Sequence, residues 1–207
     1  MAQWIIFGAS KGVGRHLVDL GLAAGHHISA LVRSESTAKE LGKLGVETYL
    51  GDAVVDNSLH TLFSNASPNS IIFSTLGGGD ADFTGNFTVI KRAEQHAISR
   101  LLLVTSIGCG DTWLSLSPRA KSLFGRAVRY KSMAESYLQT SELAFTILRP
   151  GGLVNTAGSG HCELLVGEAH GIVSRYDVAK QLQKLAEDRQ SYGQVYAVID
   201  SQLRPNW

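Results

Sequence analysis

Short apolar runs alternate with longer amphipathic stretches along the whole chain. Most of the runs are apolar almost throughout, as expected for strands that helices cover on both faces. This alternation is typical of a parallel α/β sheet, so we expect a doubly wound fold. The pattern predicts strands at 3–7, 28–32, 46–50, 70–74, 101–105, 144–148 and 195–199, and helices at about 12–24, 36–43, 56–64, 84–98, 121–140 and 175–187.

Local signals mark two helix ends and one irregular segment. Asp56 has the residue type of an N-cap for the third helix, and Gly25 is placed to end the first. The glycine-rich segment 151–174 interrupts the alternation, and we expect it to hold a short hairpin of 163–166 with 171–174 that acts as a substrate lid. Because no linker or repeat is found, the sequence predicts a single domain over 1–207 with this insertion inside it.

Composition narrows the function classes. Nineteen Lys and Arg against 18 Asp and Glu give a net charge of +1, which argues against a nucleic-acid or membrane-surface binder. The 44% of hydrophobic residues exclude a disordered chain, and no apolar run approaches the length that would insert into a membrane. Cys109 and Cys162 are too few for a disulfide framework. We therefore expect a cytoplasmic protein.

The strongest chemical signal is a glycine loop between the first predicted strand and the first predicted helix. Glycines remove the Cβ atoms that block a tight turn and the approach of a pyrophosphate, and the helix N-terminus offers free N–H groups. The spacing here is Gly-x-x-x-Gly-x-Gly rather than Gly-x-Gly-x-x-Gly. The predicted dinucleotide contacts in this loop are Gly8, Ser10, Lys11, Gly12, Val13 and Gly14.

The end of the second predicted strand indicates which dinucleotide is bound. NAD-preferring domains usually carry an acid here for the ribose hydroxyls, whereas this chain has Arg33 with Ser34 beside it. An arginine fork suits a 2′-phosphate, so we expect NADP(H) rather than NAD(H). Lys11 either adds a second cation at that phosphate or is simply solvated.

Two further strand ends belong to the same edge of the sheet. Asp52 and Ala53 follow the third strand, where a carboxylate either accepts the adenine amino group or starts a helix. Thr75, Leu76 and Gly77 follow the fourth strand, and Gly77 is the first of three successive glycines. These glycines either let the backbone approach a ligand closely or form a mobile surface loop.

Together these blocks resemble the short-chain dehydrogenase/reductase superfamily. They are most similar to its atypical branch, which contains nitrogen-metabolite-repressor-like proteins and biliverdin-IXβ/flavin reductases. The resemblance covers nearly the whole chain and implies a Rossmann fold with strand order 3-2-1-4-5-6-7 and a nicotinamide dinucleotide site. Its carriers are Gly8–Gly14, Leu31–Arg33, Gly51-Asp52, Val104–Gly108, Phe145–Leu153 and Val173–Ala179.

The resemblance also shows a departure at the reaction centre. Typical members use a serine and a Tyr-x-x-x-Lys motif, in which the tyrosine transfers the proton. Ser106 matches the serine and Lys131 the lysine, but the tyrosine position falls on Ala127. Tyr130 is adjacent to Lys131 and points about 100° away from it on a helix, so it does not replace the missing tyrosine. The catalytic candidates are therefore Ser106 and Lys131, each with a plain alternative as a turn residue and an exposed helix lysine.

The nicotinamide end is expected to lie by the turn that follows the sixth predicted strand. Pro150 lacks an N–H, while two glycines would leave the next backbone amides free for the carboxamide. This prediction covers Pro150, Gly151, Gly152 and Leu153, with Lys131 at the nicotinamide ribose. Substrate is expected to enter between the loops 77–86, 108–120 and 151–174.

Other residues contribute weaker signals. Segment 119–131 carries five cations and no acid, which suits either an anionic substrate or a solvated helix face. Trp113 forms an aromatic wall over the substrate or a packing contact, and Cys109 is expected to be partly accessible. The histidines lack metal-ligand spacing, so no metal is expected.

Two functions remain open at this point. The first is an NADP(H)-dependent oxidoreductase that transfers hydride to a small conjugated or carbonyl acceptor, with the proton coming from solvent or substrate. The second is a non-enzymatic NADP(H) sensor or assembly factor, which the missing tyrosine favours. A transient-redox epimerase or lyase is less consistent with the sequence, because such enzymes usually keep the tyrosine. The substrate and the oligomeric state are not specified by the sequence.

Overall fold

The computed structural model describes residues 2–204, and its centre is an eight-stranded sheet in the order β3-β2-β1-β4-β5-β6-β10-β8. All neighbouring pairs are parallel except β10 and β8. The predicted Rossmann order is therefore confirmed, with β10 in the seventh place and one antiparallel edge strand added. The strands are β1 (Gln3–Phe7), β2 (His27–Val32), β3 (Glu47–Leu50), β4 (Ile71–Ser74), β5 (Arg100–Val104), β6 (Ala144–Pro150), β8 (Cys162–Leu165) and β10 (Gln194–Asp200).

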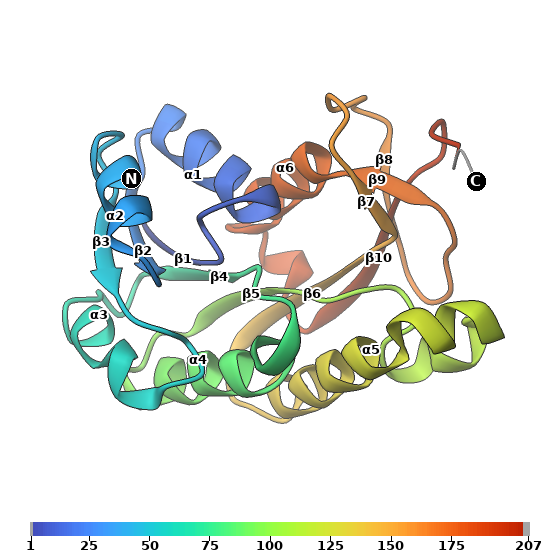
Figure 1. The fold of residues 1–207 in the computed structure, drawn as a ribbon, viewed down its shortest axis with the longest axis horizontal. Helices are drawn as coiled ribbons and strands as arrows, with labels where there is room; N and C mark the ends of the chain where they lie inside the picture. Colours follow the sequence, from blue (N-terminus) through green and yellow to red (C-terminus); the bar gives the residue numbers. More distant parts are fainter. Residues whose placement is uncertain (1, 205–207) are drawn as a thin grey trace.

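Helices cover both faces of the sheet (Figure 1). On one face lie α1 (Gly12–Ala23), α2 (Glu35–Gly42) and α6 (Arg175–Leu185), and on the other lie α3 (His60–Ser64), α4 (Thr84–Gln95) and α5 (Pro118–Gln139). Alternate residues of β1 enter the two hydrophobic layers: Trp4 and Ile6 pack with α1 and α6, whereas Ile5 and Phe7 pack with α3, α4 and α5. Burial of both faces explains why the strands are apolar almost throughout.

Short 3₁₀ turns join several of these elements: η1 (Asp56–Leu59), η2 (Gly79–Asp82), η3 (Gly110–Ser115) and η4 (Arg189–Ser191). The predicted helix 56–64 is thus split into η1 and α3. Asp56 is not an N-cap, because its carboxylate accepts two hydrogen bonds from the Arg92 guanidinium at 2.8 and 2.9 Å. Gly25 does end α1: it has φ +78° and donates its N–H to the Leu22 carbonyl.

The predicted hairpin of 163–166 with 171–174 is wrong. β8 pairs with β10, while β9 (Ile172–Ser174) runs parallel to β7 (Gly152–Val154) in a separate two-stranded sheet. The Gly152 N–H donates to the Gly171 carbonyl at 3.0 Å. A Cβ on Gly151 would lie 2.3 Å from that oxygen, so only glycine allows the two segments to meet there. This pairing depends on close approach of distant backbones and leaves no periodic signal in the sequence.

A buried ion pair fixes α5 against β6 and holds η3. The Arg149 guanidinium donates to both Glu135 oxygens at 3.0 and 2.7 Å and to Asp111 at 2.6 Å. Glu135 also accepts from the Thr105 hydroxyl at 2.5 Å. Burial alone would lower the pKa of Arg149, but the two carboxylates outweigh it and the pKa is raised. The same contact lowers the pKa of Asp111.

We expect Glu135→Gln to lower the free energy of unfolding by about 3 kcal/mol, because Arg149 then stays buried without its full counter-charge. Glu40→Gln removes an exposed ion pair to Arg15 and is the matched control, with an expected loss under about 1 kcal/mol. Urea unfolding of both variants measures the difference. Equal losses would contradict a special role for the buried pair.

Candidate functional site

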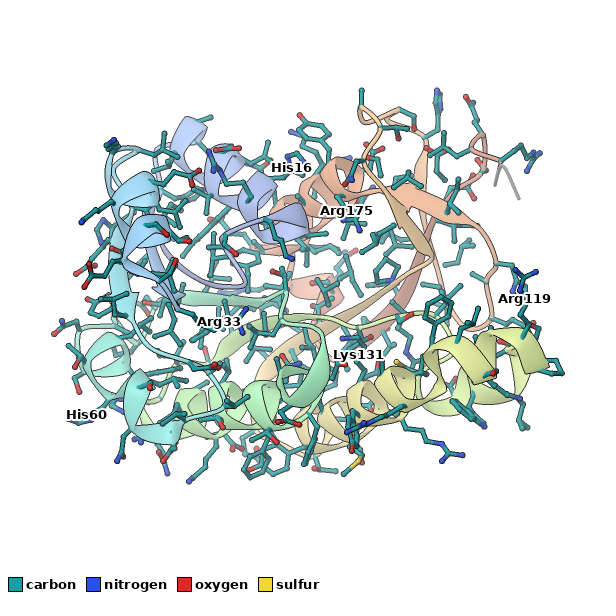
Figure 2. All side chains as sticks on the ribbon, in the orientation of Figure 1. His16, Arg33, His60, Arg119, Lys131 and Arg175 are labelled. Atoms are coloured by element: carbon teal, nitrogen blue, oxygen red, sulfur yellow. The ribbon has the colours of Figure 1, made fainter. Side chains whose placement is uncertain are left out.

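A cavity of about 860 Å³ runs along the carboxyl ends of the central strands. Parallel strands bring these ends to one edge, where open α/β sheets bind ligands. Figure 2 shows Arg33, Arg175 and Lys131 around this central region, and all three line the cavity. The residues of the predicted site that line it are Gly8, Ser10, Lys11, Gly12, Val13, Arg33, Ser34, Asp52, Ala53, Thr75, Leu76, Gly77, Lys131 and Leu153.

Five residues of the predicted site do not line this cavity: Gly14, Ser106, Pro150, Gly151 and Gly152. Gly14 has a packing role instead. A Cβ at this position would lie 2.3 Å from the Gly8 carbonyl oxygen and 2.6 Å from the Thr75 hydroxyl. Gly14 therefore lets α1 begin directly against the strand ends, which is the role of a glycine that allows close helix–strand packing.

The glycine loop leaves the start of α1 open to the cavity. Gly8 and Gly12 have φ +88° and +61°, a backbone conformation that other residues rarely adopt. Lys11 occupies the N-cap position but makes no side-chain cap hydrogen bond. The first N–H groups of α1 are therefore not capped by a side chain, and they carry the positive end of the helix dipole. This arrangement has the chemistry of an anion site.

The Arg33 end of the cavity is also rich in donors. Arg33 is exposed and forms no ion pair within residues 2–204. Ser34 caps α2 by accepting the Thr37 N–H at 3.3 Å, which places a second helix N-terminus beside Arg33. Thr37 also lines the cavity, although the sequence motifs did not predict it. The available signal was its place in the first turn of a helix, three residues after the N-cap serine.

The structure is consistent with both predicted roles of Asp52, as a ligand contact and as an acid that starts a turn. Its carboxylate accepts the Val54 N–H at 3.1 Å, as a turn-initiating acid does, and it still lines the cavity. Its carboxylate therefore supports the loop after β3 while facing the ligand space.

Lys131 is held in the cavity by a residue that the sequence analysis missed. Its ammonium forms an ion pair with Asp82, whose side chain is only 2% exposed. Asp82 also accepts the Gly78 N–H at 2.9 Å. A Cβ on Gly77 would lie 3.2 Å from the Lys131 Nζ, so the glycines give the lysine room. The acid-rich stretch directly after these glycines was the available signal for Asp82.

Ala127 lines the cavity one helical turn before Lys131, and Tyr130 does not line it. No tyrosine is among the residues that line the cavity. Tyr130 instead stacks under the Arg126 guanidinium, 5.3 Å from the ring centroid, on another face of α5. The cavity therefore reaches Ala127, the position at which typical members carry the tyrosine.

The turn after β6 does not offer the free amides expected there. The Gly151 N–H donates to the Val198 carbonyl at 2.9 Å, and the Gly152 N–H is used by Gly171. These bonds join β10 and β9 to the turn, so the expectation of free amides is wrong. Ser106 is half-buried and follows Thr105, which does line the cavity. Its carbonyl accepts the Cys109 N–H, as in a turn.

Arg175 is a third cavity residue that the sequence motifs did not predict. It begins α6 and donates to the Leu153 carbonyl at 3.1 Å and to the Asn155 side chain at 2.8 Å. A Cβ on Gly12 would lie 3.4 Å from the Arg175 Cδ, so the arginine side chain lies over the glycine loop. Asn155 also lines the cavity. The sequence signal for Arg175 was a cation at the start of the last main helix. Its place beside Gly12 depends on the tertiary structure.

Two weaker expectations about this region are decided by the structure. Cys109 is fully buried, and burial raises the pKa of its thiol to about 12, so the expected accessibility is wrong. Trp113 does not line the cavity and packs on Gly125 of α5, so it is not a wall of this space. Within residues 2–204 no group of three or more His, Cys, Asp and Glu side chains is arranged to hold a metal ion. No helix in that range is long and apolar enough to cross a membrane.

Comparison with known proteins now adds to this geometry. The family described as NAD(P)H-binding matches residues 8–189, which is most of the chain. The chain belongs to this family. It is an NAD(P)-binding Rossmann protein of the atypical short-chain dehydrogenase/reductase type, as the sequence motifs predict. The expected nicotinamide cofactor agrees with the family.

Solved structures of Escherichia coli proteins are similar over their whole length. ChuY of strain O157:H7, described as an anaerobilin reductase, is 43% identical with a TM-score of 0.95, covering 99% of this chain and 100% of that one. ChuY of strain CFT073 is 40% identical with a TM-score of 0.91 and the same coverage. The family resemblance therefore includes a reductase at high identity.

Curated relatives are more varied. An uncharacterised sugar epimerase of Bacillus subtilis, YhfK, is 29% identical over 84% of this chain and 83% of its own. Sanguinarine reductase of Eschscholzia californica is 34% identical, but over only 48% of this chain and 37% of that protein.

A further solved structure shows the shared fold. It is a Veillonella parvula short-chain dehydrogenase/reductase in complex with NADP, 22% identical with a TM-score of 0.80, over 100% of this chain and 99% of that one.

We expect Gly14→Ala to destabilise the protein by about 2 kcal/mol and to weaken dinucleotide binding, because the new methyl group meets the Gly8 backbone. Gly42→Ala in α2 is the matched control, since its Cβ meets nothing within 4 Å and alanine favours the helix. Thermal unfolding and NADPH titration measure both effects. A Gly14→Ala protein with unchanged stability would contradict the packing role.

Proposed function

We propose that the protein is an NADPH-dependent reductase that transfers hydride to a conjugated acceptor. The observation that carries this proposal is that one cavity is lined both by Arg33, which forms no ion pair within residues 2–204, and by Lys131 beside Ala127. The reductases among the similar proteins support the same class of reaction. The preference for NADPH over NADH rests on the donors around Arg33.

The residues present fit a dinucleotide along its length. The 2′-phosphate would be held by Arg33 with the start of α2, and the pyrophosphate by the glycine loop at the start of α1. Arg175 lies over that loop and is positioned to neutralise the same phosphates. The nicotinamide end then lies toward Ala127, Lys131 and Leu153, the last of which belongs to the segment 151–174. We propose that this segment closes over the acceptor as a lid.

NADPH, when bound, supplies the hydride, and the acceptor gains negative charge as the hydride arrives. The Lys131 ammonium has three donors, and its ion pair with Asp82 uses one of them. The remaining donors are free for the nicotinamide ribose and for the acceptor atom on which charge accumulates. A fixed cation at that place stabilises the transition state without needing to reorganise. The proton then comes from water. Ser106 does not line the cavity itself but directly follows Thr105, which does, and it is the proposed partner for an acceptor carbonyl.

The open space at Ala127 favours a flat, extended acceptor over a small aldehyde or ketone. A conjugated system spreads the incoming charge, so it depends less on a tyrosine acid than an isolated carbonyl does. The anaerobilin reductase among the similar structures supports a linear tetrapyrrole as the acceptor class. The proposed substrate is therefore a small conjugated molecule.

One observation favours a second candidate. Because no tyrosine lines the cavity, an NADP(H) sensor or assembly factor that binds the cofactor without consuming it is consistent with the same site. Oxidation of NADPH measured across linear tetrapyrroles, flavins and quinones separates the two. Turnover of any of them supports the reductase, whereas tight cofactor binding with no turnover across the panel supports the sensor.

Arg33→Ala is expected to weaken NADPH binding by roughly 10- to 100-fold, because a charge-assisted contact to phosphate contributes about 1.5–3 kcal/mol. NADH lacks the 2′-phosphate, so its dissociation constant should change less than about threefold. Titration of the intrinsic fluorescence with each dinucleotide measures both constants. Equal affinity of the unmodified protein for NADPH and NADH would overturn the cofactor assignment.

Lys131→Met is expected to lower kcat by roughly 10²-fold, because a fixed donor to developing charge is lost. Asp82→Asn should lower kcat less, since the lysine remains but loses its orientation, and Asp82→Glu should recover part of the rate. Steady-state kinetics with a tetrapyrrole acceptor measure kcat and KM separately. If Asp82→Asn changed only stability and left kcat intact, the positioning role of Asp82 would be wrong.

A further inference from the structure

A second cavity of about 520 Å³ lies on α5, away from the dinucleotide cavity. Its lining residues are Trp113, Lys121, Gly125, Arg126, Arg129 and Tyr130, none of which lines the first cavity. Lys121, Gly125 and Arg129 follow each other at intervals of four along one helix face. Ala127 and Lys131 belong to another face, because each residue turns the helix by 100°. The two cavities therefore use different sides of the same helix.

The cations of this second cavity have no acidic partner. Within residues 2–204 no carboxylate forms an ion pair with Lys121, Arg126 or Arg129. Neighbouring cations on this side of the sheet behave differently, since Arg92 and Lys131 are both paired. Three like charges around one hollow repel one another, so an anion bound there would relieve an unfavourable field.

Aromatic rings set the positions of these cations. The Lys121 Nζ and the Arg129 guanidinium lie 5.4 and 5.1 Å from the Trp113 ring centroid, and Arg126 lies over Tyr130. Cation–π contacts at these distances are attractive and hold long side chains in place. The cavity therefore offers cations held beside ring surfaces, with Arg126 and Arg129 open to solvent.

The Trp113 ring is itself positioned by the fold. Its turn, η3, is attached to β6 through Asp111 and Arg149, and to α5 through the Gly110 N–H, which donates to the Ser132 hydroxyl at 2.9 Å. A Cβ on Gly125 would lie 3.3 Å from the indole ring, so the glycine allows the ring to lie close to the helix. The cavity is thus formed before any ligand arrives, which lowers the cost of binding.

We propose that this cavity is a binding site for a small planar molecule that carries two or more acidic groups. The ring system stacks against Trp113 and Tyr130, and the acidic groups meet Arg126 and Arg129. The volume lies within the range of small-molecule sites. Because the site is on a different face of α5 from Lys131, it binds its ligand without reducing it. It would hold a conjugated polycarboxylate outside the reaction cavity, whether or not the proposed reaction is correct.

Pyrene-1,3,6,8-tetrasulfonate tests the site, because it is a planar polyanion. We expect one molecule to bind per chain, measured by fluorescence anisotropy at physiological ionic strength, with Trp113 emission quenched. Saturating NADPH should leave its dissociation constant unchanged. Biliverdin, with two carboxylates, should displace the probe, whereas its dimethyl ester should not.

The double variant Arg126→Gln/Arg129→Gln should bind the probe roughly tenfold more weakly or worse, because two charge-assisted contacts are lost. Lys43→Gln/Lys184→Gln removes the same charge from two exposed positions elsewhere and should bind within about twofold of the unmodified protein. Unchanged NADPH binding by both variants shows that they fold.

Three results would overturn the proposal. Displacement of the probe by NADPH would place the probe in the dinucleotide cavity. If the two double variants bound the probe equally weakly, net charge alone would explain the loss of affinity. Equal displacement of the probe by biliverdin and by its dimethyl ester would show that the site does not recognise acidic groups. If the unmodified protein bound the probe but oxidised no NADPH with any acceptor of the panel, only the proposed reductase function would be refuted. The two proposals can therefore fail separately.

Discussion

The close approach of α1 to the ends of β1 and β4 is the constraint on which the rest of the site depends. A Cβ on Gly14 would lie 2.3 Å from the Gly8 carbonyl oxygen and 2.6 Å from the Thr75 hydroxyl, so only glycine allows this approach. Thr75 in turn donates to the Phe7 carbonyl at 2.9 Å and joins the two strand ends. The helix N-terminus is thereby fixed at the edge of the sheet, where its free N–H groups face the cavity.

Charge is treated differently in each part of the molecule. In the interior, Arg149 meets two carboxylates, and Lys131 meets the buried Asp82, so each cation keeps a partner away from water. Arg33 and the cations around Trp113 have no such partner within the described chain. The unpaired cations beside the two cavities keep their attraction for an anion, and this is the basis of the two proposed binding sites, whereas Lys131 keeps a carboxylate partner inside the first cavity.

Much of the fold and of one end of the site was predictable from the sequence. Continuous apolar strands, the glycine loop and Arg33 each give a local pattern, and all of them were found. Asp82 and Arg175 were missed because their local signals, an acid-rich stretch and a cation at a helix start, do not by themselves mark a ligand site. They reach the cavity because a turn after β4 and the start of α6 converge on it.

The sequence by itself determined the parallel sheet, the strand order implied by its family motifs, the glycine loop and the absence of a tyrosine before Lys131. These features are encoded in neighbouring residues or in a fixed helical spacing. The tertiary structure alone decided that the Gly151 and Gly152 amides are used by distant strands and that Trp113 lies away from the cofactor cavity. Such contacts join residues far apart in the chain, so their hydrogen-bond partners and close approaches exist only once the backbone has folded.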